Sequence, residues 1–329
     1  MSAHATGSVP VGDDPGDVQI AAVLPAQLVA AVHHLVDAAT AADGVPPLSE
    51  HVTLHLRHGG EGPDRHLLVA LPGGGLAGYA HLDPTDQVAG AAAELVVHPA
   101  HRGRGLGRRL VAAAERLSPA GRLRLWAHGD HRAARRLALA LGYHEIRRLE
   151  QWRRSLFPPL PAAQVPAGVT LRPFRPGTDD SAWLALNARA FAGHPEQGGW
   201  TERDLHARTA EGWFDPDGFL LAEEDGELIG FHWTKVHGGT TQGDGAAGHA
   251  HDPIGEVYVV GVDPRQQGRG LGRALTVAGL ARLRSQGLAQ AMLYVESDNT
   301  PARATYTSLG FTHWDTDVMF SRELHDHTG

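Results

Sequence analysis

Two glycine-rich loops carry the clearest chemical signal in this 329-residue sequence. One runs Gln267-Gly-Arg-Gly-Leu-Gly-Arg273 and the other Arg102-Gly-Arg-Gly-Leu-Gly-Arg-Arg109, each between an apolar run and a helical pattern. Glycines let successive backbone N–H groups turn toward one ligand, and the start of the following helix adds a positive dipole end. With their arginines, these loops are suited to bind a pyrophosphate. An ordinary glycine-rich turn is the alternative for either loop taken alone.

A dinucleotide-binding loop is the sharper alternative for these glycines. That motif requires G-x-G-x-x-G close behind its strand. Both loops here read G-x-G-x-G, and in the second one Asp263 to Gln267 follow the strand before the first glycine. The spacing therefore argues against a Rossmann site.

An internal repeat indicates which elements position the loops. Glu94–Leu110 aligns with Val259–Leu275 at an offset of 268 − 103 = 165 residues, and Trp126–Tyr143 aligns with Tyr294–Phe311 at an offset of 294 − 126 = 168. Two matches in the same order at nearly one offset indicate a duplicated domain. Each copy reads as a Val-rich strand, the loop, an amphipathic helix, a short strand and a second helix.

Composition along the chain predicts the domain boundaries. Residues 1–17 are small and polar and are expected to form a flexible tail. The Pro-rich stretch 157–168 is predicted to link an N-terminal domain at 18–156 to a C-terminal domain at 169–329. A mobile loop is expected at Gly238–Pro253, which is Gly-rich and without periodicity.

The bulk composition argues against several classes of protein. The net charge of −8 disfavours nucleic acid or an anionic membrane as the main partner, since both require a basic surface. Cysteine is absent, which excludes disulfides and zinc–thiolate sites. The chain shows neither a signal peptide nor an apolar stretch of about 18–20 residues. We therefore expect a soluble, cytoplasmic protein. A monomer is a separate expectation that does not follow from this composition.

Histidine is abundant, but its spacing predicts no metal site. The run His249-Ala-His251-Asp252 ends the Gly-rich loop, which is poorly suited to preorganise ligands. The other histidines are scattered along the chain.

The loops and a second motif resemble the GNAT (GCN-related N-acetyltransferase) family. The pattern Q/R-x-x-G-x-G/A after a Val-rich strand resembles that family's coenzyme A loop, and Asn299–Phe311 resembles its last motif, N-x-x-A…Y…L-G-F. The resemblance implies an α/β (α+β) fold of two tandem GNAT domains. Each would be a mixed, mostly antiparallel sheet flanked by helices and splayed between two central strands, with the co-substrate acetyl-CoA in the split.

The resemblance also implies the residues that contact the coenzyme. The backbone of Val260, Gly261 and Val262 would pair with the pantetheine arm and polarise the thioester carbonyl. The other expected contacts are Leu95, Val96, Val97, Gly103, Arg104, Gly105, Leu106, Gly107 and Arg108 in the first half, and Gln267, Gly268, Arg269, Gly270, Leu271, Gly272, Arg273, Asn299, Thr300, Pro301, Ala302, Arg303 and Ala304 in the second.

Acetyl transfer from a thioester to an amine needs a base for the ammonium proton, and it is helped by an acid that protonates the leaving thiolate. The second half supplies Glu256 at the start of its strand and Tyr306 in its last helix; a solvated charge and a packed aromatic are the alternatives. Offsets of 165 and 168 place Ala91 and Ala138 there in the first half. We therefore predict that the second half is catalytic. The first half would bind acetyl-CoA without turnover or, alternatively, be a scaffold with a vestigial loop.

Further segments resemble the mycothiol synthase family, in order along nearly the whole chain. They are DGVPPLSE (43–50), AFAGHPEQGGW (190–200), WFDPDGF (213–219), GFHWTKVH (230–237), GEVYVVGVDP (255–264) and LYVESDN (293–299). The resemblance implies acetylation of the cysteine amine of Cys-GlcN-Ins, a cysteine amide of glucosaminyl-inositol, to give mycothiol and CoA.

The same resemblance implies a set of substrate contacts. They are Glu50, Glu196, Lys235, Glu256 and Tyr294, in a cleft between the domains. Carboxylates suit an α-ammonium and sugar hydroxyls, while Lys235 and the Tyr294 hydroxyl add donors. Ordinary surface charge is the alternative for Glu196 and Lys235. At the level of the whole protein, a tandem GNAT acting on another small amine or on a protein N-terminus, and a non-catalytic acetyl-CoA sensor, remain open.

Overall fold

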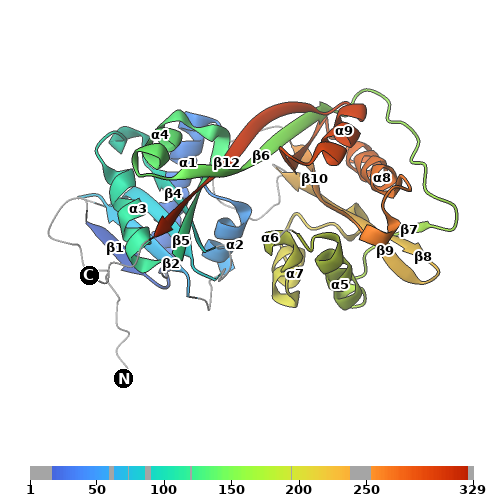
Figure 1. The fold of residues 1–329 in the computed structure, drawn as a ribbon, viewed down its shortest axis with the longest axis horizontal. Coiled ribbons are helices and arrows are strands. Elements are labelled where there is room, and N and C mark those ends of the chain that lie inside the picture. The colour runs from blue at the N-terminus through green and yellow to red at the C-terminus, as the bar shows by residue number, and fades with distance from the viewer. Residues whose placement is uncertain are drawn as a thin grey trace, which may run out of the picture. The chain divides into compact units, whose positions relative to one another are not determined.

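The computed structural model describes residues 17–58, 63–72, 74–85, 90–118, 121–193, 195–237 and 253–324. Within these residues the chain forms two compact units, unit 1 (Met1–Arg148 and Thr316–Gly329) and unit 2 (Leu149–Asp315) (Figure 1). Residues 1–16 of the predicted tail and 238–252 of the predicted loop lie outside the described residues.

Unit 1 packs helices against a mixed sheet of strand order β1-β2-β3-β4-β5-β12. Its elements are β1 (Val18–Ala21), α1 (Ala26–Asp43), α2 (Glu50–His58), β2 (Arg65–Ala70), β3 (Leu76–Asp83), β4 (Ala91–Val97), η1 (Pro99–His101), α3 (Leu106–Leu117), β5 (Gly121–Ala127), η2 (His128–Asp130), α4 (Arg132–Ala140) and the start of β6 (His144–Ser155). The β4–β5 pair is parallel, and the other described pairs in this sheet are antiparallel.

Unit 2 repeats this plan with the strand order β6-β11-β10-β9-β8-β7. Its elements are β7 (Thr170–Pro173), α5 (Asp180–Ala190), α6 (Pro195–Gly198), α7 (Glu202–Thr209), η3 (Pro216–Gly218), β8 (Phe219–Glu224), β9 (Glu227–His237), β10 (Ile254–Val262), η4 (Pro264–Gln266), α8 (Leu271–Ser285), β11 (Gln290–Glu296), α9 (Thr300–Ser308) and the start of β12 (Thr312–Leu324). Here β10–β11 is the parallel pair.

In both units the parallel pair separates part of the way along. Ala91–Glu94 of β4 pair with β5, and Leu95–Val97 continue beyond that pairing. Gly255–Val257 of β10 pair with β11, and the strand then continues to Val262. The free edges expose backbone N–H and C=O groups that an extended ligand can pair with. This confirms the predicted split between two central strands.

The last strand of each sequence repeat pairs with the sheet that is formed mainly by the other repeat. Leu149–Ser155 of β6 pair with β11 in unit 2, and Val318–Leu324 of β12 pair with β5 in unit 1. Figure 1 shows β12, drawn in red, beside β5. The predicted boundaries, 18–156 and 169–329, treat each half as continuous and differ from the structure by this exchange. Pairing of distant strands is non-local, and two repeated strands fit either sheet, so the sequence pattern does not specify the exchange.

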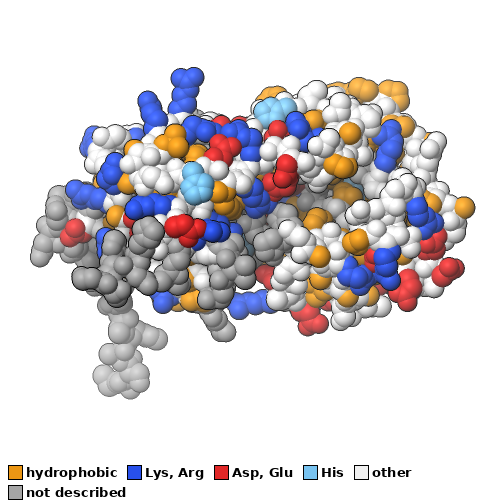
Figure 2. Space-filling view, viewed as in Figure 1, with side chains coloured by type: hydrophobic (Ala, Val, Ile, Leu, Met, Phe, Trp, Pro, Cys, Tyr) orange, Lys and Arg blue, Asp and Glu red, His pale blue; other side chains and the backbone are white. Residues whose placement is uncertain are grey.

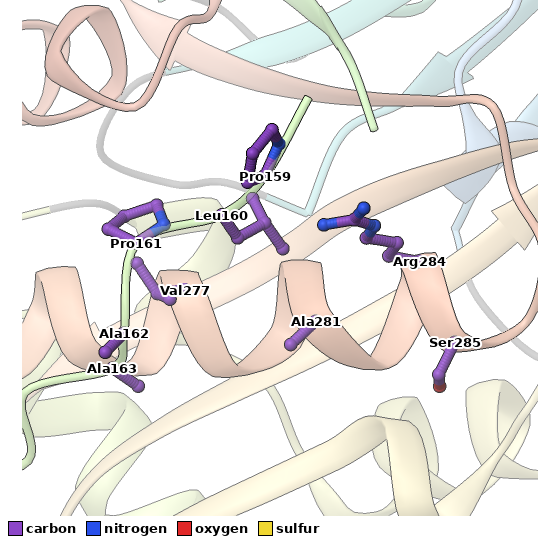
Figure 3. A pocket seen from close by; sticks show the side chains of 9 residues that line it. All are labelled: Pro159, Leu160, Pro161, Ala162, Ala163, Val277, Ala281, Arg284 and Ser285. Atoms are coloured by element: carbon purple, nitrogen blue, oxygen red, sulfur yellow. The ribbon is translucent and has the colours of Figure 1, made fainter. Parts of the chain in front are cut away.

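The Pro-rich segment 157–168 joins two strands of the same unit, β6 and β7, rather than two domains. Leu160 packs against an apolar cluster that α8 contributes to, and Arg284 Nη2 donates to the carbonyl oxygen of Phe157. A cavity of about 560 Å³ lies between Pro159–Ala163 and α8. Figure 3 shows the side chains that line it. The predicted interdomain linker is therefore part of unit 2. The chain passes from one unit to the other within β6 and at Asp315–Thr316 of β12.

Helices cover both faces of each sheet, so most central-strand residues are apolar and buried. Buried polar residues on these strands are the informative exceptions. They are His66, His81, Glu94, Arg124, Thr316, Asp317 and Ser321 in unit 1 and Arg154, His232, Thr234, Lys235 and Glu256 in unit 2. Lys235 and Glu256 belong to the candidate active site, and His81 belongs to a second buried polar group in unit 1; both are described below.

Acidic and basic side chains are interspersed over the face of the molecule seen in Figure 2. Among the described residues, no helix is both long enough and apolar enough to cross a membrane.

Candidate active site

A β-bulge shapes the strand that carries the predicted base. The β9–β10 register shifts between Val257 and Val259, so Tyr258 is an extra residue in β10, whereas the β3–β4 pairing is regular. A bulge re-aims side chains and interrupts pairing locally. The bulge coincides with the end of the β10–β11 pairing, at the mouth of the split.

The bulge also corrects the correspondence between the two halves. Glu256 lies opposite Met292, and the equivalent parallel pair in unit 1 joins Ala92 and Arg124. The counterpart of Glu256 is therefore Ala92 and not Ala91, because a constant offset takes no account of the extra residue. The contrast between the halves is unchanged, since both residues are alanine.

Glu256, Lys235 and Tyr294 lie on one face of the unit 2 sheet. Glu256 is directly opposite Lys235 on β9 and Met292 on β11, and directly opposite residues share a face. Tyr294 is two residues beyond Met292 and points the same way. A Cβ on the adjacent Gly255 would meet α8 at 2.8 Å, so α8 covers the other face.

The carboxylate of Glu256 is buried and bound to a histidine. The residue is 6% exposed, and its Oε2 lies 2.6 Å from Nε2 of His237. His237 lies two residues beyond Lys235 on β9, which makes it a diagonal neighbour of Glu256. A carboxylate held in this way can accept a proton while the imidazole fixes its orientation. His237 was not among the site residues predicted from the sequence, although strand alternation along GFHWTKVH places it on the face of Lys235.

Lys235 is a buried part of this site. It is 8% exposed, and its Nζ lies 4.5 Å from the ring centroid of Trp213 and 5.3 Å from that of Tyr258. These are cation–π distances, and such contacts strengthen when the cation is desolvated. The alternative of an ordinary surface charge therefore does not hold for Lys235.

Three segments of the sequence, 190–200, 213–219 and 255–264, meet around Tyr258. Its ring centroid lies 6.3 Å from Trp200 and 5.3 Å from Trp213, and its hydroxyl accepts a 2.8 Å hydrogen bond from Nε of Arg208. The Arg208 guanidinium in turn lies 4.0 Å from the ring centroid of Trp200. The result is a wall of aromatic rings and cations beside Glu256. Glu196 lies in α6 of the same unit, but its side chain is outside the described residues.

Tyr294 and Glu50 are the remaining predicted substrate contacts. Tyr294 is 40% exposed, and its hydroxyl accepts a 2.8 Å hydrogen bond from Gln151, its cross-strand partner on β6. Glu50 begins α2 in unit 1. Its role stays a prediction.

Tyr306 lies on α9 and packs on the apolar cluster that includes Val257 and Leu293. Although its ring is only partly buried, burial of the phenol raises the pKa of Tyr306 to about 12. The hydroxyl therefore stays protonated at neutral pH and can donate to a leaving thiolate. The bounds of α4 and α9 agree at the offset of 168, so Ala138 occupies the position in α4 that Tyr306 occupies in α9.

The unit 2 glycine loop has the geometry of an anion site. Gly268 and Gly270 have φ values of +80° and +79°, a left-handed conformation that favours glycine, and Gly270 caps the N-terminus of α8. The first N–H groups of α8, from Leu271 to Arg273, lack intrahelical partners and suit a phosphate. Gln267 is exposed at the start of the loop.

The arginines of this loop are already paired. Arg269 donates from both terminal nitrogens to the carboxylate of Glu224, at 2.7 Å each, and Arg273 hydrogen-bonds Ser308. An arginine engaged in this way must leave its partner before it can bind a phosphate. The backbone amides are therefore better placed than Arg269 to form the cradle.

Helix α9 is the next element after β11, the strand that carries Tyr294. The Asn299 side chain caps this helix by accepting from the backbone N–H of Ala302, with Thr300 and Pro301 between them. Arg303 Nε lies 3.2 Å from Glu150 Oε2 on β6, so its predicted coenzyme contact competes with an ion pair. Ala304 is exposed.

Unit 1 contains a cavity of about 390 Å³ built from its own glycine loop and split. The residues that line it include eight of the predicted coenzyme contacts, namely Leu95, Val96, Val97, Gly103, Gly105, Leu106, Gly107 and Arg108. Ala138 also lines it, whereas Arg104 is exposed on the loop. Arg102 is held by a bidentate pair with Asp43 at 2.6 and 2.7 Å.

A buried charge cluster that sequence reasoning missed borders this cavity. His128, which lines the cavity, lies 3.1 Å from Asp317 of β12 through Nδ1 and 3.5 Å from Glu94 of β4 through Nε2. Glu94 also accepts a 2.6 Å hydrogen bond from the Ser49 backbone. Burial alone would lower the pKa of His128, but the two carboxylates outweigh it and raise this pKa to about 10. The three residues come from β4, η2 and β12, which are distant in the sequence, so no local pattern reveals them.

We expect His128→Gln to destabilise unit 1 by about 3–5 kcal/mol, because Glu94 and Asp317 would lose their buried counter-charge. The raised pKa of His128 stabilises the fold fully below about pH 6.5, and this contribution is lost as the pH rises toward 10. Thermal unfolding from pH 6 to 10 should therefore show the gap between wild type and variant narrowing as the pH rises. The half-exposed His131→Gln is the control, and a pH-independent gap would contradict the assigned charge.

The glycine loops on split sheets define the class of this protein. A sequence model of the "Acetyltransferase (GNAT) family" matches residues 183–311, and one of an "Acetyltransferase (GNAT) domain" matches residues 63–145. The chain belongs to the GNAT family of acetyltransferases, which use acetyl-CoA as co-substrate.

Full-length relatives narrow this class further. The chain is 58% identical to the mycothiol acetyltransferase of Acidothermus cellulolyticus over 299 residues, 90% of this chain and 91% of that protein. It is 55% identical to that of Thermobispora bispora over 318 residues, 96% of this chain and all of that protein. These relatives confirm the resemblance to the mycothiol synthase family.

Solved structures confirm the tandem GNAT fold. A GCN5-related N-acetyltransferase from Sphaerobacter thermophilus matches with a TM-score of 0.67 at 28% identity, over 93% of this chain and 95% of that chain. A tandem GNAT protein from the clavulanic acid biosynthesis pathway matches with a TM-score of 0.69 at 22% identity, over 93% of this chain and 98% of that chain, and supports the fold alone.

Proposed function

We propose that this chain transfers the acetyl group of acetyl-CoA to the cysteine amine of Cys-GlcN-Ins, giving mycothiol and CoA. The observation that carries the proposal is the buried Glu256 carboxylate, which is paired with the partly exposed His237 and lies where the β10–β11 pairing ends. The substrate is inferred from mycothiol acetyltransferases that are 52–58% identical over most of the chain.

The residues of unit 2 divide the proton transfers between them. Glu256 takes the proton of the substrate ammonium, and His237 holds that carboxylate in place. The free amine attacks the thioester carbonyl, so that a C–N bond forms and the C–S bond breaks. As the C–S bond breaks, the thiolate of CoA receives the proton of the Tyr306 hydroxyl. The nitrogen of the new amide then releases its surplus proton, which restores the Tyr306 hydroxyl. Each transfer of this kind contributes about 10²–10⁴-fold to the rate.

The substrate lies on the sheet face that carries Lys235 and Tyr294. Lys235, held over aromatic rings, and the Tyr294 hydroxyl supply donors to sugar hydroxyls and the amide, while Glu256 attracts the ammonium. We further propose that the protein acts on this small molecule as a cytoplasmic monomer, independently of nucleic acid and membranes, in keeping with its net charge of −8.

Unit 1 binds a second acetyl-CoA without turning it over. Its cavity is formed by a complete glycine loop and split, while Ala92 and Ala138 stand where unit 2 has Glu256 and Tyr306. Coenzyme binding there stabilises unit 1 and does not contribute to catalysis.

We expect Gly270→Asp to abolish turnover and leave one acetyl-CoA bound per chain, whereas Gly105→Asp should also leave one bound and retain turnover. Both glycines cap their helices at positive φ, and each substitution places a negative charge at the helix N-terminus. No heavy atom lies within 4 Å of a Cβ at either position, and Asp tolerates positive φ better than most residues. Calorimetry gives the stoichiometry. Loss of all binding in Gly270→Asp would show that unit 1 is only a scaffold.

The proposed function is tested by acetylation of Cys-GlcN-Ins beside a panel of glucosamine, cysteine, an aminoglycoside and a peptide N-terminus. We expect Cys-GlcN-Ins to have the highest kcat/KM, measured as release of CoA thiol. A better substrate elsewhere in the panel would overturn the assignment. Acetyl-CoA binding with no acetylation of any amine would favour the sensor.

A further inference from the structure

Unit 1 contains a second group of buried polar side chains, which the proposed function does not use. His55 of α2, Asp64 just before β2 and His81 of β3 each offer one ligand-type atom, and these atoms lie within 4.8 Å of one another. The side chains are 11%, 10% and 2% exposed. The group therefore lies beneath α2, inside the unit.

The spacing of these atoms matches a metal coordination shell. Asp64 Oδ2 lies 3.0 Å from Nδ1 of His55 and 3.6 Å from Nε2 of His81. Ligands about 2.0–2.1 Å from a tetrahedral Zn²⁺ are on the order of 3.3 Å apart. Two imidazoles and one carboxylate are a donor set that divalent transition metals prefer, and a water would complete the tetrahedron.

The group is also incomplete without a further partner. Across the described residues, neither Nε2 of His81 nor Oδ1 of Asp64 has a hydrogen-bond partner, although both atoms are buried. Buried polar atoms in native proteins are nearly always paired, and an orphan requires an explanation such as an ion. A cation between the three side chains would satisfy the imidazole nitrogen and neutralise the carboxylate.

The surroundings support binding by holding the ligands in place. His81 is the cross-strand partner of His66, whose Nδ1 lies 2.8 Å from the Tyr79 hydroxyl. The His66 ring centroid is 5.5 Å from that of His55 and 5.6 Å from that of His81. Such outer residues orient metal ligands and tune the affinity of a site.

We propose that His55, Asp64 and His81 form a binding site for a divalent transition-metal ion, with Zn²⁺ as the probe. The ion fastens α2 to β2 and β3 and so stabilises unit 1. No metal site was predicted from the sequence because the ligands lie in α2, in the segment before β2 and in β3, 9 and 17 residues apart (64 − 55 and 81 − 64). Only the packing of α2 on the sheet brings them together.

The test uses the full-length protein without a histidine tag, stripped of metal by a chelator. Zn²⁺ is titrated against a chromophoric chelator, and the bound metal is counted by mass spectrometry. We expect one tightly bound Zn²⁺ per chain and a melting temperature that rises with its concentration. His81→Gln and His55→Gln should each weaken binding by more than the 10- to 100-fold typical for loss of an outer-shell residue.

Matched controls separate this site from other histidines. His51→Gln changes the same residue type on the same helix, at a side chain that is 55% exposed, and should leave Zn²⁺ affinity unchanged. The double variant His249→Ala/His251→Ala removes the two histidines at the end of the Gly-rich loop and should behave likewise.

Two results would overturn the proposal. One is a stripped wild-type protein that binds no Zn²⁺ and shows no thermal shift, a measurement that does not depend on any variant folding. The other is a folded His81→Gln, checked by circular dichroism, that binds Zn²⁺ as tightly as wild type.

Discussion

Glu256→Gln is expected to lower kcat by about 10²–10⁴-fold while the affinity for acetyl-CoA stays unchanged. The amide has nearly the shape of the carboxylate, but it cannot take the proton of the substrate ammonium. The glycine loop and the free edge of β10, at Val260–Val262, do not involve this side chain, so the coenzyme should still bind. Steady-state kinetics with Cys-GlcN-Ins and calorimetry with acetyl-CoA measure the two effects separately.

The control for Glu256→Gln is Glu227→Gln, which removes an exposed carboxylate from the adjacent strand β9 and should leave kcat unchanged. The pH profile distinguishes a base from a structural role. Loss of a general base removes the acidic limb of kcat/KM, whereas simple misfolding lowers the rate at every pH. Near-normal turnover in Glu256→Gln would remove Glu256 as the base and leave its partner His237 as the next candidate.

The second large effect concerns which fragment of the chain folds. A fragment of residues 169–329, cut at the sequence-based boundary, should fail to fold, whereas residues 149–315 should fold and bind acetyl-CoA. The first fragment lacks the seven residues of β6 that pair with β11, and it retains a β12 whose partner strand β5 is absent.

The energetic reason lies in the buried side chains that β6 and its exit contribute. Trp152 is 7% exposed and Leu156 is 1% exposed, and both belong to the cluster beneath α8 and α9. Removing a buried Trp or Leu costs about 3–5 or 2–5 kcal/mol, and a domain has only about 5–15 kcal/mol of stability. Losing both side chains and the strand ladder should therefore unfold unit 2.

Circular dichroism, thermal unfolding and acetyl-CoA calorimetry on both fragments decide this prediction. A third fragment, 157–315, omits the paired part of β6 together with Leu156 and is the matched control for the role of that segment. Cooperative unfolding of 169–329 with normal coenzyme binding would show that β6 is dispensable and that the exchange of strands is not needed for stability.

The sequence alone was sufficient for the features that depend on local pattern. The glycine loops, the helices after them and the Leu-Gly-aromatic exits are repeated in the chain, and they are repeated in space. Helices α3 and α8 start at the offset of 165, and Gly142 and Gly310 have φ values of +81° and +82°, as a helix C-terminus requires. Apolar periodicity and glycine conformation act over a few residues, so they can be read without knowing the fold.

The predicted roles of Glu256 and Tyr306 also came from local pattern, because a repeat shows which positions differ between its copies. The residues around them depended on pairing between strands. The bulge at Tyr258 changed the counterpart of Glu256 from Ala91 to Ala92, and the β9–β10 register brought His237 to within 2.6 Å of that carboxylate.

Only the tertiary structure decided which strand completes which sheet and which buried charges meet. The exchange of β6 and β12 and the cluster of Glu94, His128 and Asp317 join segments far apart in the chain, and the group of His55, Asp64 and His81 joins three separate segments. Hydrogen bonding along a strand edge is largely independent of sequence, and a buried charge is stabilised by whichever partner the fold brings to it. Neither leaves a periodic signal, so these features follow from the packing of distant elements and not from any one stretch of the sequence.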